Sequence, residues 1–289
     1  MDDRLARFVG SLGASLKSLV KIAVESRGRT RVKAPEAPTL PLVVMGNGPS
    51  LNDTIADCRR QLEVLPLLAV NFAALSPEFG QLRPSYYVLA DPVFFAPATE
   101  GNVGKLRDAF ARIDWPVTLF VPIRSKAAAH RLTAGNANIT VAGFNPVGVE
   151  GFELLEEKAF DLGLGMPRPR NVLIPSLMIA ISLGFKTIYV AGADHSWMKT
   201  LDVTDDNTVV SVQPHFYAES NEEKARVTSV YKDVRLHEVV YSFYVAFKSY
   251  FTIERYARRR GVSIYNVTPG SFIDAFQRCN LATVSVRPE

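Results

Sequence analysis

Several features that would place a protein in a familiar class are scarce or absent in this sequence of 289 residues. It has two cysteines, Cys58 and Cys279, which excludes a disulfide-stapled scaffold and points to a reducing compartment. No apolar run approaches the roughly 18 residues that a membrane-spanning helix needs. A secretory leader is not apparent either, because the first apolar residues form no long run and no small-residue cleavage site follows them. The sequence therefore predicts a cytoplasmic protein.

The main part of the chain also lacks an excess of basic residues. The net charge is +4, but residues 1–33 alone hold eight basic and three acidic side chains, so the remainder is close to neutral. We find no nucleic-acid-binding signature, no zinc-ligand spacing, no CxxC motif and no Ser-His-Asp order. We therefore expect no nucleic-acid partner.

What the sequence does contain is an alternation of short apolar runs with helical segments. An apolar fraction of 47% with 21% charged residues is typical of a globular protein with a sizeable core. The alternation predicts a single α/β domain with a mostly parallel, Rossmann-like sheet and helices on both faces. Expected strands are 42–45, 67–70, 86–90, 117–121, 187–191 and 262–266, and expected helices are 176–183 and 244–260.

We predict three segments along the chain. Residues 1–34 form a basic amphipathic helix and a linker, and residues 35–289 form the nucleotide-sugar-binding domain. Within that domain, residues 197–236 are too polar and irregular for core and too long for a plain connection. Such segments are often active-site lids, which is our expectation here.

The first expected strand runs into a Gly-rich turn, followed by the start of a helix. The turn reads Gly46, Asn47, Gly48, Pro49, Ser50. Glycines let the backbone approach a ligand closely, Ser50 or Asn52 can cap the helix, and backbone N–H groups at such a turn can face an anion. The turn lacks the third glycine of GxGxxG and is not followed by Gly-Lys-Ser/Thr. We therefore predict a nucleotide site that is neither a dinucleotide fingerprint nor a Walker A loop.

A polar residue stands at the carboxyl end of five of the expected strands, including the first. These residues are Asn47, Asn71, Asp91, Asp194 and Asn266. In open α/β sheets, ligands bind just beyond the carboxyl ends of the strands. The pattern therefore predicts a shared cleft at that edge.

Several blocks of the sequence occur in an order known from one family. They are residues 42–51, the strands ending at Asn71 and near Asp91, residues 170–194 with their Leu-Gly-Phe and Gly-Ala-Asp motifs, and residues 264–271. Over about residues 42–276 the chain resembles glycosyltransferase family 42, the bacterial sialyltransferases that use CMP-sialic acid. The same blocks resemble the broader MptE-like superfamily of 6-hydroxymethylpterin diphosphokinase-type domains.

The resemblance implies a set of donor-binding residues. The loop Gly46–Ser50 and Asn71 would contact the nucleotide, Gly192, Ala193 and Asp194 would meet the ribose, and Asn171 would lie near the donor. The family's two phosphate-binding tyrosines match Ser196 and Asp202 here. Tyr217 is therefore our candidate for binding the departing phosphate.

Sugar transfer needs a base that accepts the proton of the acceptor hydroxyl, and imidazole suits that role near neutral pH. His195 follows Asp194 at the end of a strand, His215 lies in the expected lid, and His237 precedes the last long helix. We predict the catalytic base among these three histidines.

The sequence leaves three functions open. The first is a glycosyltransferase with a nucleotide-activated donor, such as a CMP-linked sugar, and a glycan or lipid-linked acceptor in surface polysaccharide or lipopolysaccharide synthesis. The second is a Mg²⁺-dependent diphosphokinase in which Asp202, Asp205 and Asp206 hold the metal, since hard cations prefer carboxylates. The third is a non-catalytic domain that binds a glycan or a protein.

Residues 1–24 carry apolar side chains at helical spacing and basic side chains opposite them. We predict that this helix lies on an anionic membrane surface, peripheral to the inner membrane. Two other arrangements remain open: the apolar stripe packs on the body of the domain, or it forms a seam in a homo-oligomer.

Overall fold

The core of the fold is an eight-stranded sheet in the order β10-β9-β6-β1-β2-β3-β4-β5, in which every neighbouring pair is parallel. The computed structural model describes residues 3–30, 37–96, 101–211 and 234–285. The strands are β1 (Leu42–Met45), β2 (Leu67–Val70), β3 (Tyr86–Val88), β4 (Val117–Pro122), β5 (Ile139–Phe144), β6 (Thr187–Ala191), β9 (Ser263–Asn266) and β10 (Gln277–Arg278). The parallel sheet confirms the predicted fold class.

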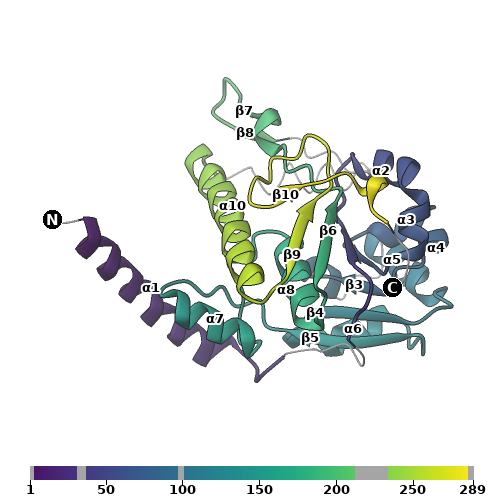
Figure 1. The fold of residues 1–289 in the computed structure, drawn as a ribbon, viewed down its shortest axis with the longest axis horizontal. Helices are drawn as coiled ribbons and strands as arrows, with labels where there is room; N and C mark the ends of the chain where they lie inside the picture. The colour runs from purple at the N-terminus through teal and green to yellow at the C-terminus, as the bar shows by residue number, and fades with distance from the viewer. Residues whose placement is uncertain (1–2, 31–36, 97–100, 212–233, 286–289) are drawn as a thin grey trace.

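Helices cover both faces of this sheet (Figure 1). One layer contains α2 (Leu51–Asp57), α3 (Arg59–Val64), α4 (Phe79–Leu82), α5 (Gly101–Ala111) and α6 (Lys126–Leu132). The other contains α7 (Glu153–Asp161), α8 (Leu173–Leu183) and α10 (Leu236–Arg259). Among the described helices, α1 (Asp3–Glu25) lies outside the two layers.

Strand β1 shows why short apolar runs are enough to form the strands of this sheet. Its side chains alternate, so that Val43 and Met45 pack into the core on the α2–α6 side. Leu42 and Val44 pack into the core on the α8 side. A parallel strand covered on both faces is apolar throughout, and here all four residues are buried.

Six expected strands are present within two residues of their predicted ends, but other elements differ from the prediction. Strand β5 was missed because Thr140, Ala142 and Gly143 interrupt its apolar pattern. Helix α10 begins at Leu236 and not at Tyr244, because the Glu238 carboxylate accepts from the N–H of Arg235 and caps the helix there, and Val239 and Phe243 already belong to its buried face. The predicted end of α8 is correct, since Gly184 terminates it with a φ of 98°.

Sheet order reverses between β1 and β6. From β1 the chain builds the sheet in one direction through β2 to β5, and from β6 in the other through β9 and β10. The loops that leave two strands at such a point diverge, and the space between them is the usual ligand site of open α/β folds. The Gly-rich turn and the Gly192–Asp194 segment follow these two strands.

Part of the expected lid is described. Residues 197–200 form a 3-10 turn, and β7 (Leu201–Val203) and β8 (Val209–Ser211) form an antiparallel hairpin. Val209 is buried against Val239 and Phe243 of α10, so the hairpin rests on the start of that helix. The predicted lid residues 212–233 lie outside the described residues, and the lid function stays a prediction.

Candidate functional site

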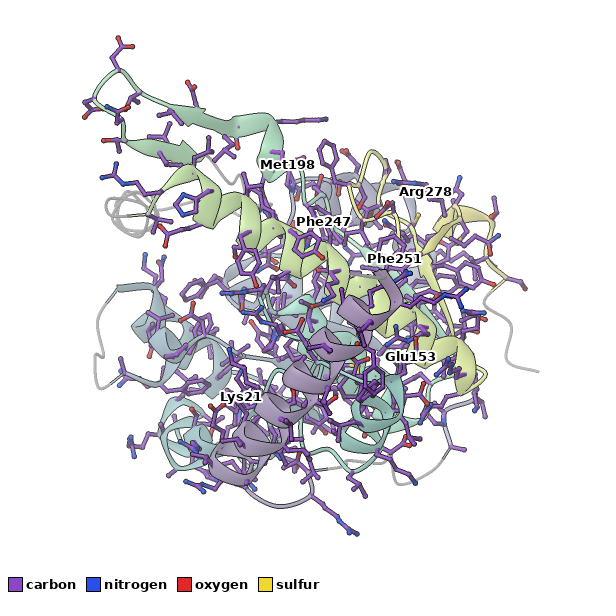
Figure 2. All side chains as sticks on the ribbon, turned by 90° about the vertical axis from the view of Figure 1, so that its left-hand side faces the viewer. Lys21, Glu153, Met198, Phe247, Phe251 and Arg278 are labelled. Carbon is purple, nitrogen blue, oxygen red and sulfur yellow. The ribbon has the colours of Figure 1, made fainter. Side chains whose placement is uncertain are left out.

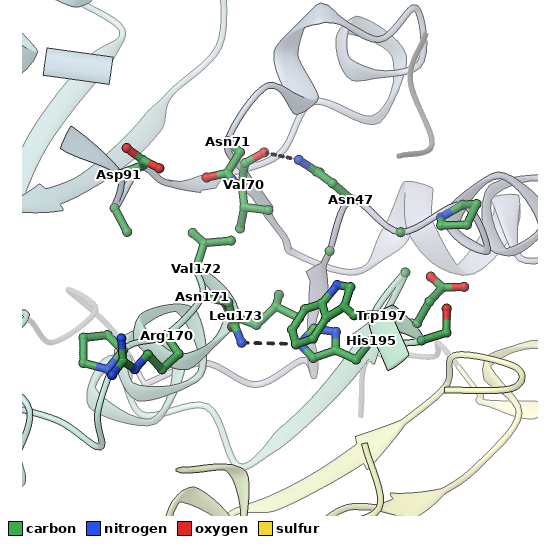
Figure 3. Close-up of a pocket in the computed structure, with 18 of the residues that line it drawn as sticks. Asn47, Val70, Asn71, Asp91, Arg170, Asn171, Val172, Leu173, His195 and Trp197 are labelled. Carbon is green, nitrogen blue, oxygen red and sulfur yellow. Dashed lines mark hydrogen bonds between the residues drawn. The ribbon is translucent and has the colours of Figure 1, made fainter. Parts of the chain in front are cut away.

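A cavity of about 500 Å³ opens at the carboxyl edge of the sheet, between the loops after β1 and β6. The loops after β2 and β3 and the segment before α8 complete its wall (Figure 3). Nine of the eleven predicted binding residues line it: Gly46, Asn47, Gly48, Pro49, Asn71, Asp91, Asn171, Gly192 and Asp194. His195, one of the predicted catalytic residues, also lines it.

The other predicted site residues lie elsewhere. Ser50 and Ala193 are neighbours of the lining residues but do not line the cavity themselves. His237 lies in the first turn of α10 and not before that helix as predicted; it is exposed and does not line the cavity. His215 and Tyr217 lie outside the described residues.

The two glycines of the turn bring the loops after β1 and β6 into contact. The N–H of Gly46 donates to the Ala191 carbonyl, and the N–H of Gly48 donates to the Gly192 carbonyl, each at 2.8 Å. These two N–H groups are therefore not available to an anion. A Cβ on Gly46 would lie 3.0 Å from the Gly192 carbonyl carbon and closer still to its oxygen.

Ser50 also differs from the expected helix cap. It occupies the N-cap position of α2 but makes no side-chain cap hydrogen bond. Its hydroxyl instead donates to Oδ2 of Asp194 at 2.8 Å, across the gap between the two loops. Ser50 therefore orients the carboxylate of Asp194, which lines the cavity.

Two asparagines of the cavity wall hold unused hydrogen-bond acceptors. Asn47 donates through Nδ2 to the Val70 carbonyl at 3.3 Å, and Asn71 adopts a left-handed φ of 51° at the end of β2. Within the described part of the chain, the buried Oδ1 atoms of both residues have no hydrogen-bond partner. Buried acceptors without partners are costly, so a ligand that donates to them would bind favourably.

Cationic side chains that the sequence analysis did not select also reach this cavity. Arg170 precedes α8, and Lys199 lies in the 3-10 turn after β6, with its ammonium 5.2 Å from the centre of the Phe272 ring. Asp91 and Asp194 supply the negative charge of the wall. Neither residue directly follows an expected strand, so the rule that ligands bind beyond the carboxyl ends of strands could not select them. Tertiary packing brings both side chains to the opening of the cavity.

Below the cavity, three polar side chains form a buried network. The Tyr250 hydroxyl lies 2.6 Å from Nε2 of His195 and 3.0 Å from Oδ1 of Asn171. Asn171 Oδ1 also accepts from the N–H of Leu173 at 3.0 Å, at the start of α8. The network therefore links the loop after β6 to two helices and fixes the wall of the cavity. Figure 3 shows one of its contacts, between Asn171 Nδ2 and His195 Nε2, at 3.4 Å.

His195 is held in an unusual environment. It has a left-handed φ of 51°, is buried, and its ring centre lies 4.2 Å from that of Trp197. Burial lowers the pKa of His195 to about 3. An efficient general base has a pKa near the operating pH, so His195 fits a positioning role better than the predicted role of base.

Replacing Tyr250 with phenylalanine tests the network. The variant keeps the ring but leaves His195 with one hydrogen-bond partner fewer in a buried site, and we expect a loss of about 1–3 kcal/mol of unfolding free energy. Chemical denaturation measures this loss. Tyr244→Phe on the exposed side of α10 is the matched control and should change stability by less than about 0.5 kcal/mol. Equal stability of both variants would argue against a structural network.

The carboxylates proposed to hold Mg²⁺ do not converge. Asp202 accepts from the N–H of Val203, and Asp206 bonds to the hydroxyls of Thr204 and Thr208 within the hairpin. Among the described residues, no group of three or more His, Cys, Asp or Glu side chains is placed to hold a metal ion. The acidic segment is a solvated hairpin turn, and it gives no support to the diphosphokinase alternative.

Asn266 is also buried away from the predicted cleft. It donates to the Ile273 carbonyl and accepts from the N–H of Thr268, each at 3.0 Å. The loop that it shapes braces the β6 loop in turn, since Thr268 accepts from the N–H of Ala193. Asn266 therefore supports the cavity wall from behind.

Comparisons with known proteins agree with the architecture. The sequence matches no protein-family model and no curated protein. Among solved structures, the chain is similar to the MAf glycosyltransferase from Magnetospirillum magneticum AMB-1, with a TM-score of 0.52 and 10% identity. The match covers 96% of this chain and 39% of that protein, so the chain spans about two fifths of its length. At this identity the likeness shows a shared fold.

Proposed function

We propose that this chain is a glycosyltransferase that binds a nucleotide-activated sugar in the cavity beside the Gly-rich turn. The observation that carries the proposal is the pair of buried, unpartnered acceptors on Asn47 and Asn71 in the wall of that cavity. A nucleotide supplies hydroxyl or amino hydrogens that suit both atoms. The shared fold with a glycosyltransferase supports the same reading.

The charges of the cavity suit the two ends of such a donor. Arg170 and Lys199 can meet the phosphates, and the carboxylate of Asp194, oriented by Ser50, can accept from ribose hydroxyls. The sequence resemblance to the sialyltransferases favours a CMP-linked sugar as donor and a surface glycan or a lipid-linked glycan as acceptor. His215 is the histidine that we retain as the candidate base, with Tyr217 as the candidate phosphate ligand.

A thermal-shift screen of the full chain with CMP, CDP, UDP, GDP and ATP tests the proposal. A nucleotide at a hundred times its Kd stabilises a protein by about 2.7 kcal/mol, which raises the Tm of a domain of this size by roughly 5 °C. We expect this response with at least one of the five, and CMP or CDP to give the largest shift. No response to any nucleotide would overturn the proposal.

Asparagine variants show whether the response comes from this cavity. Asn71→Gly suits the left-handed backbone but removes the amide, and we expect about fivefold weaker nucleotide binding from one lost hydrogen bond. Asn207→Gly is the matched control, because Asn207 has a φ of 60° in the exposed hairpin turn. If both variants bind as the wild type does, the nucleotide lies elsewhere.

A further inference from the structure

The outward face of α1 carries large apolar side chains that stay about half exposed in the described structure, although the Phe8 ring lies against that of Phe152, with 5.4 Å between the ring centres. Each of them is 43–63% exposed, and together they run the length of the helix: Leu5, Phe8, Val9, Leu12, Leu16, Leu19, Val20 and Val24. Contiguous exposed apolar patches of this kind mark interaction sites for proteins or membranes. Among the described helices, none combines the length and the apolar character of a membrane span.

The helix turns a different face to the body of the protein. Ser15 and Ser18 are buried against the segment before α7, where Ser18 donates to the Glu150 carbonyl at 2.7 Å and Ser15 accepts from the N–H of Phe152 at 2.9 Å. A side chain on Gly151 would overlap with Ser15, so the approach is close. The structure thus argues against one alternative left open by the sequence, since the apolar stripe, apart from Phe8 at its edge, faces away from the body.

The C-terminal end of α1 is held as well. Arg124 donates to the carbonyls of Val24 and Glu25, each at 3.2 Å, and the N–H of Arg27 donates to Oδ1 of Asn145 at 3.0 Å. Figure 2 views the molecule from the side on which α1 lies in front of the body. The apolar face is therefore presented in a fixed orientation before any partner binds.

The width of this face distinguishes between partners. A two-helix seam needs only the narrow stripe formed by Leu5, Val9, Leu12, Leu16 and Leu19. Phe8, Val20 and Val24 widen it on both sides, and all three are more than half exposed. A broad apolar face suits an extended surface better than a single neighbouring helix.

The charge of the helix favours the same partner. Arg4, Arg7, Lys17 and Lys21 outnumber the acidic residues of α1, and Arg27 and Arg29 follow directly. A second copy would bring together two helices that each carry a net positive charge, whereas an anionic bilayer attracts such a helix, by about 1 kcal/mol for each basic residue close to the surface. Charge complementarity therefore selects an anionic lipid surface.

We propose that α1 is a membrane-docking element, which places its apolar face at the headgroup boundary of an anionic bilayer and its serine face on the protein. The bond network at Ser15, Ser18 and Arg124 then fixes the orientation of the whole domain relative to the lipid. This inference does not depend on the nature of the reaction in the cavity.

Sedimentation of the full chain with vesicles tests the proposal. We expect binding to phosphatidylcholine–phosphatidylglycerol vesicles and much weaker binding to phosphatidylcholine alone. Leu12→Glu combined with Leu16→Glu should weaken binding by about tenfold or more, because two apolar anchors are lost. Val64→Glu, at a comparably exposed apolar residue of α3, is the matched control and should bind as the wild type does.

A milder variant separates the charge effect from the apolar effect. Lys17→Gln leaves the apolar face intact and should weaken binding to the anionic vesicles by about fivefold, with added salt having a similar effect. Wild-type protein that stays in the supernatant at low salt would overturn the proposal. A second result would also overturn it. If light scattering shows a wild-type dimer that Leu12→Glu combined with Leu16→Glu dissociates, and the wild type does not bind vesicles, then a second copy of the chain covers the apolar face.

Discussion

Replacing Gly46 with alanine should destabilise the protein by about 3 kcal/mol and abolish nucleotide binding in the cavity. The added Cβ would overlap the carbonyl group of Gly192, which is backbone and cannot rotate away. Relief requires the loops after β1 and β6 to separate, which breaks the hydrogen bond from Gly46 to the Ala191 carbonyl. Denaturant titration and the nucleotide thermal shift measure the two effects.

Gly80→Ala is the matched control for this experiment. Gly80 lies within α4, and a Cβ added there would meet no atom within 4 Å. Alanine is the better helix former, so we expect stability unchanged or raised by up to about 1 kcal/mol. A Gly46→Ala variant as stable as Gly80→Ala would show that the two loops are not in the close contact described above.

Acidification from pH 7 to pH 5 should reduce the unfolding free energy by about 2 kcal/mol through His195 alone. Burial lowers the pKa of His195 to about 3 in the folded protein, against 6.5 for the ordinary side chain. Between these values the unfolded chain binds one proton more than the folded chain. The stabilisation is therefore present above pH 6.5 and is lost as the pH falls towards 3.

His195→Asn isolates this contribution, because asparagine tolerates the left-handed φ of 51° and does not titrate. Between pH 7 and pH 5 the variant should lose about 2 kcal/mol less unfolding free energy than the wild type does. Glu156 has the opposite effect on the pH dependence of stability, because burial raises its pKa. Since both proteins contain Glu156, its contribution cancels in the comparison. Parallel stability curves for the two proteins would show that His195 is not buried as a neutral group.

The position of a residue along the chain was enough to place several residues at the cavity. Asn71, Asp91 and Asp194 were selected because each follows a strand, and parallel strands end at one edge of the sheet. Arg170 and Lys199 could not be found in this way. Their place at the cavity depends on how α8 and the turn after β6 pack, which no local pattern encodes.

The sequence by itself determined the fold class, the edge of the sheet that carries the cavity and the apolar stripe of α1, because each follows from the periodicity of adjacent residues. Only the tertiary structure decided how these parts are used. The contact between Gly46 and Gly192, the turn of Ser50 towards Asp194 and the burial of His195 against Tyr250 join residues more than fifty positions apart. The same is true of α1, whose serines bond to loop carbonyl and N–H groups and so leave its apolar face outward. The physical reason is that hydrogen bonding and close packing depend on distances in space, which the folded chain sets.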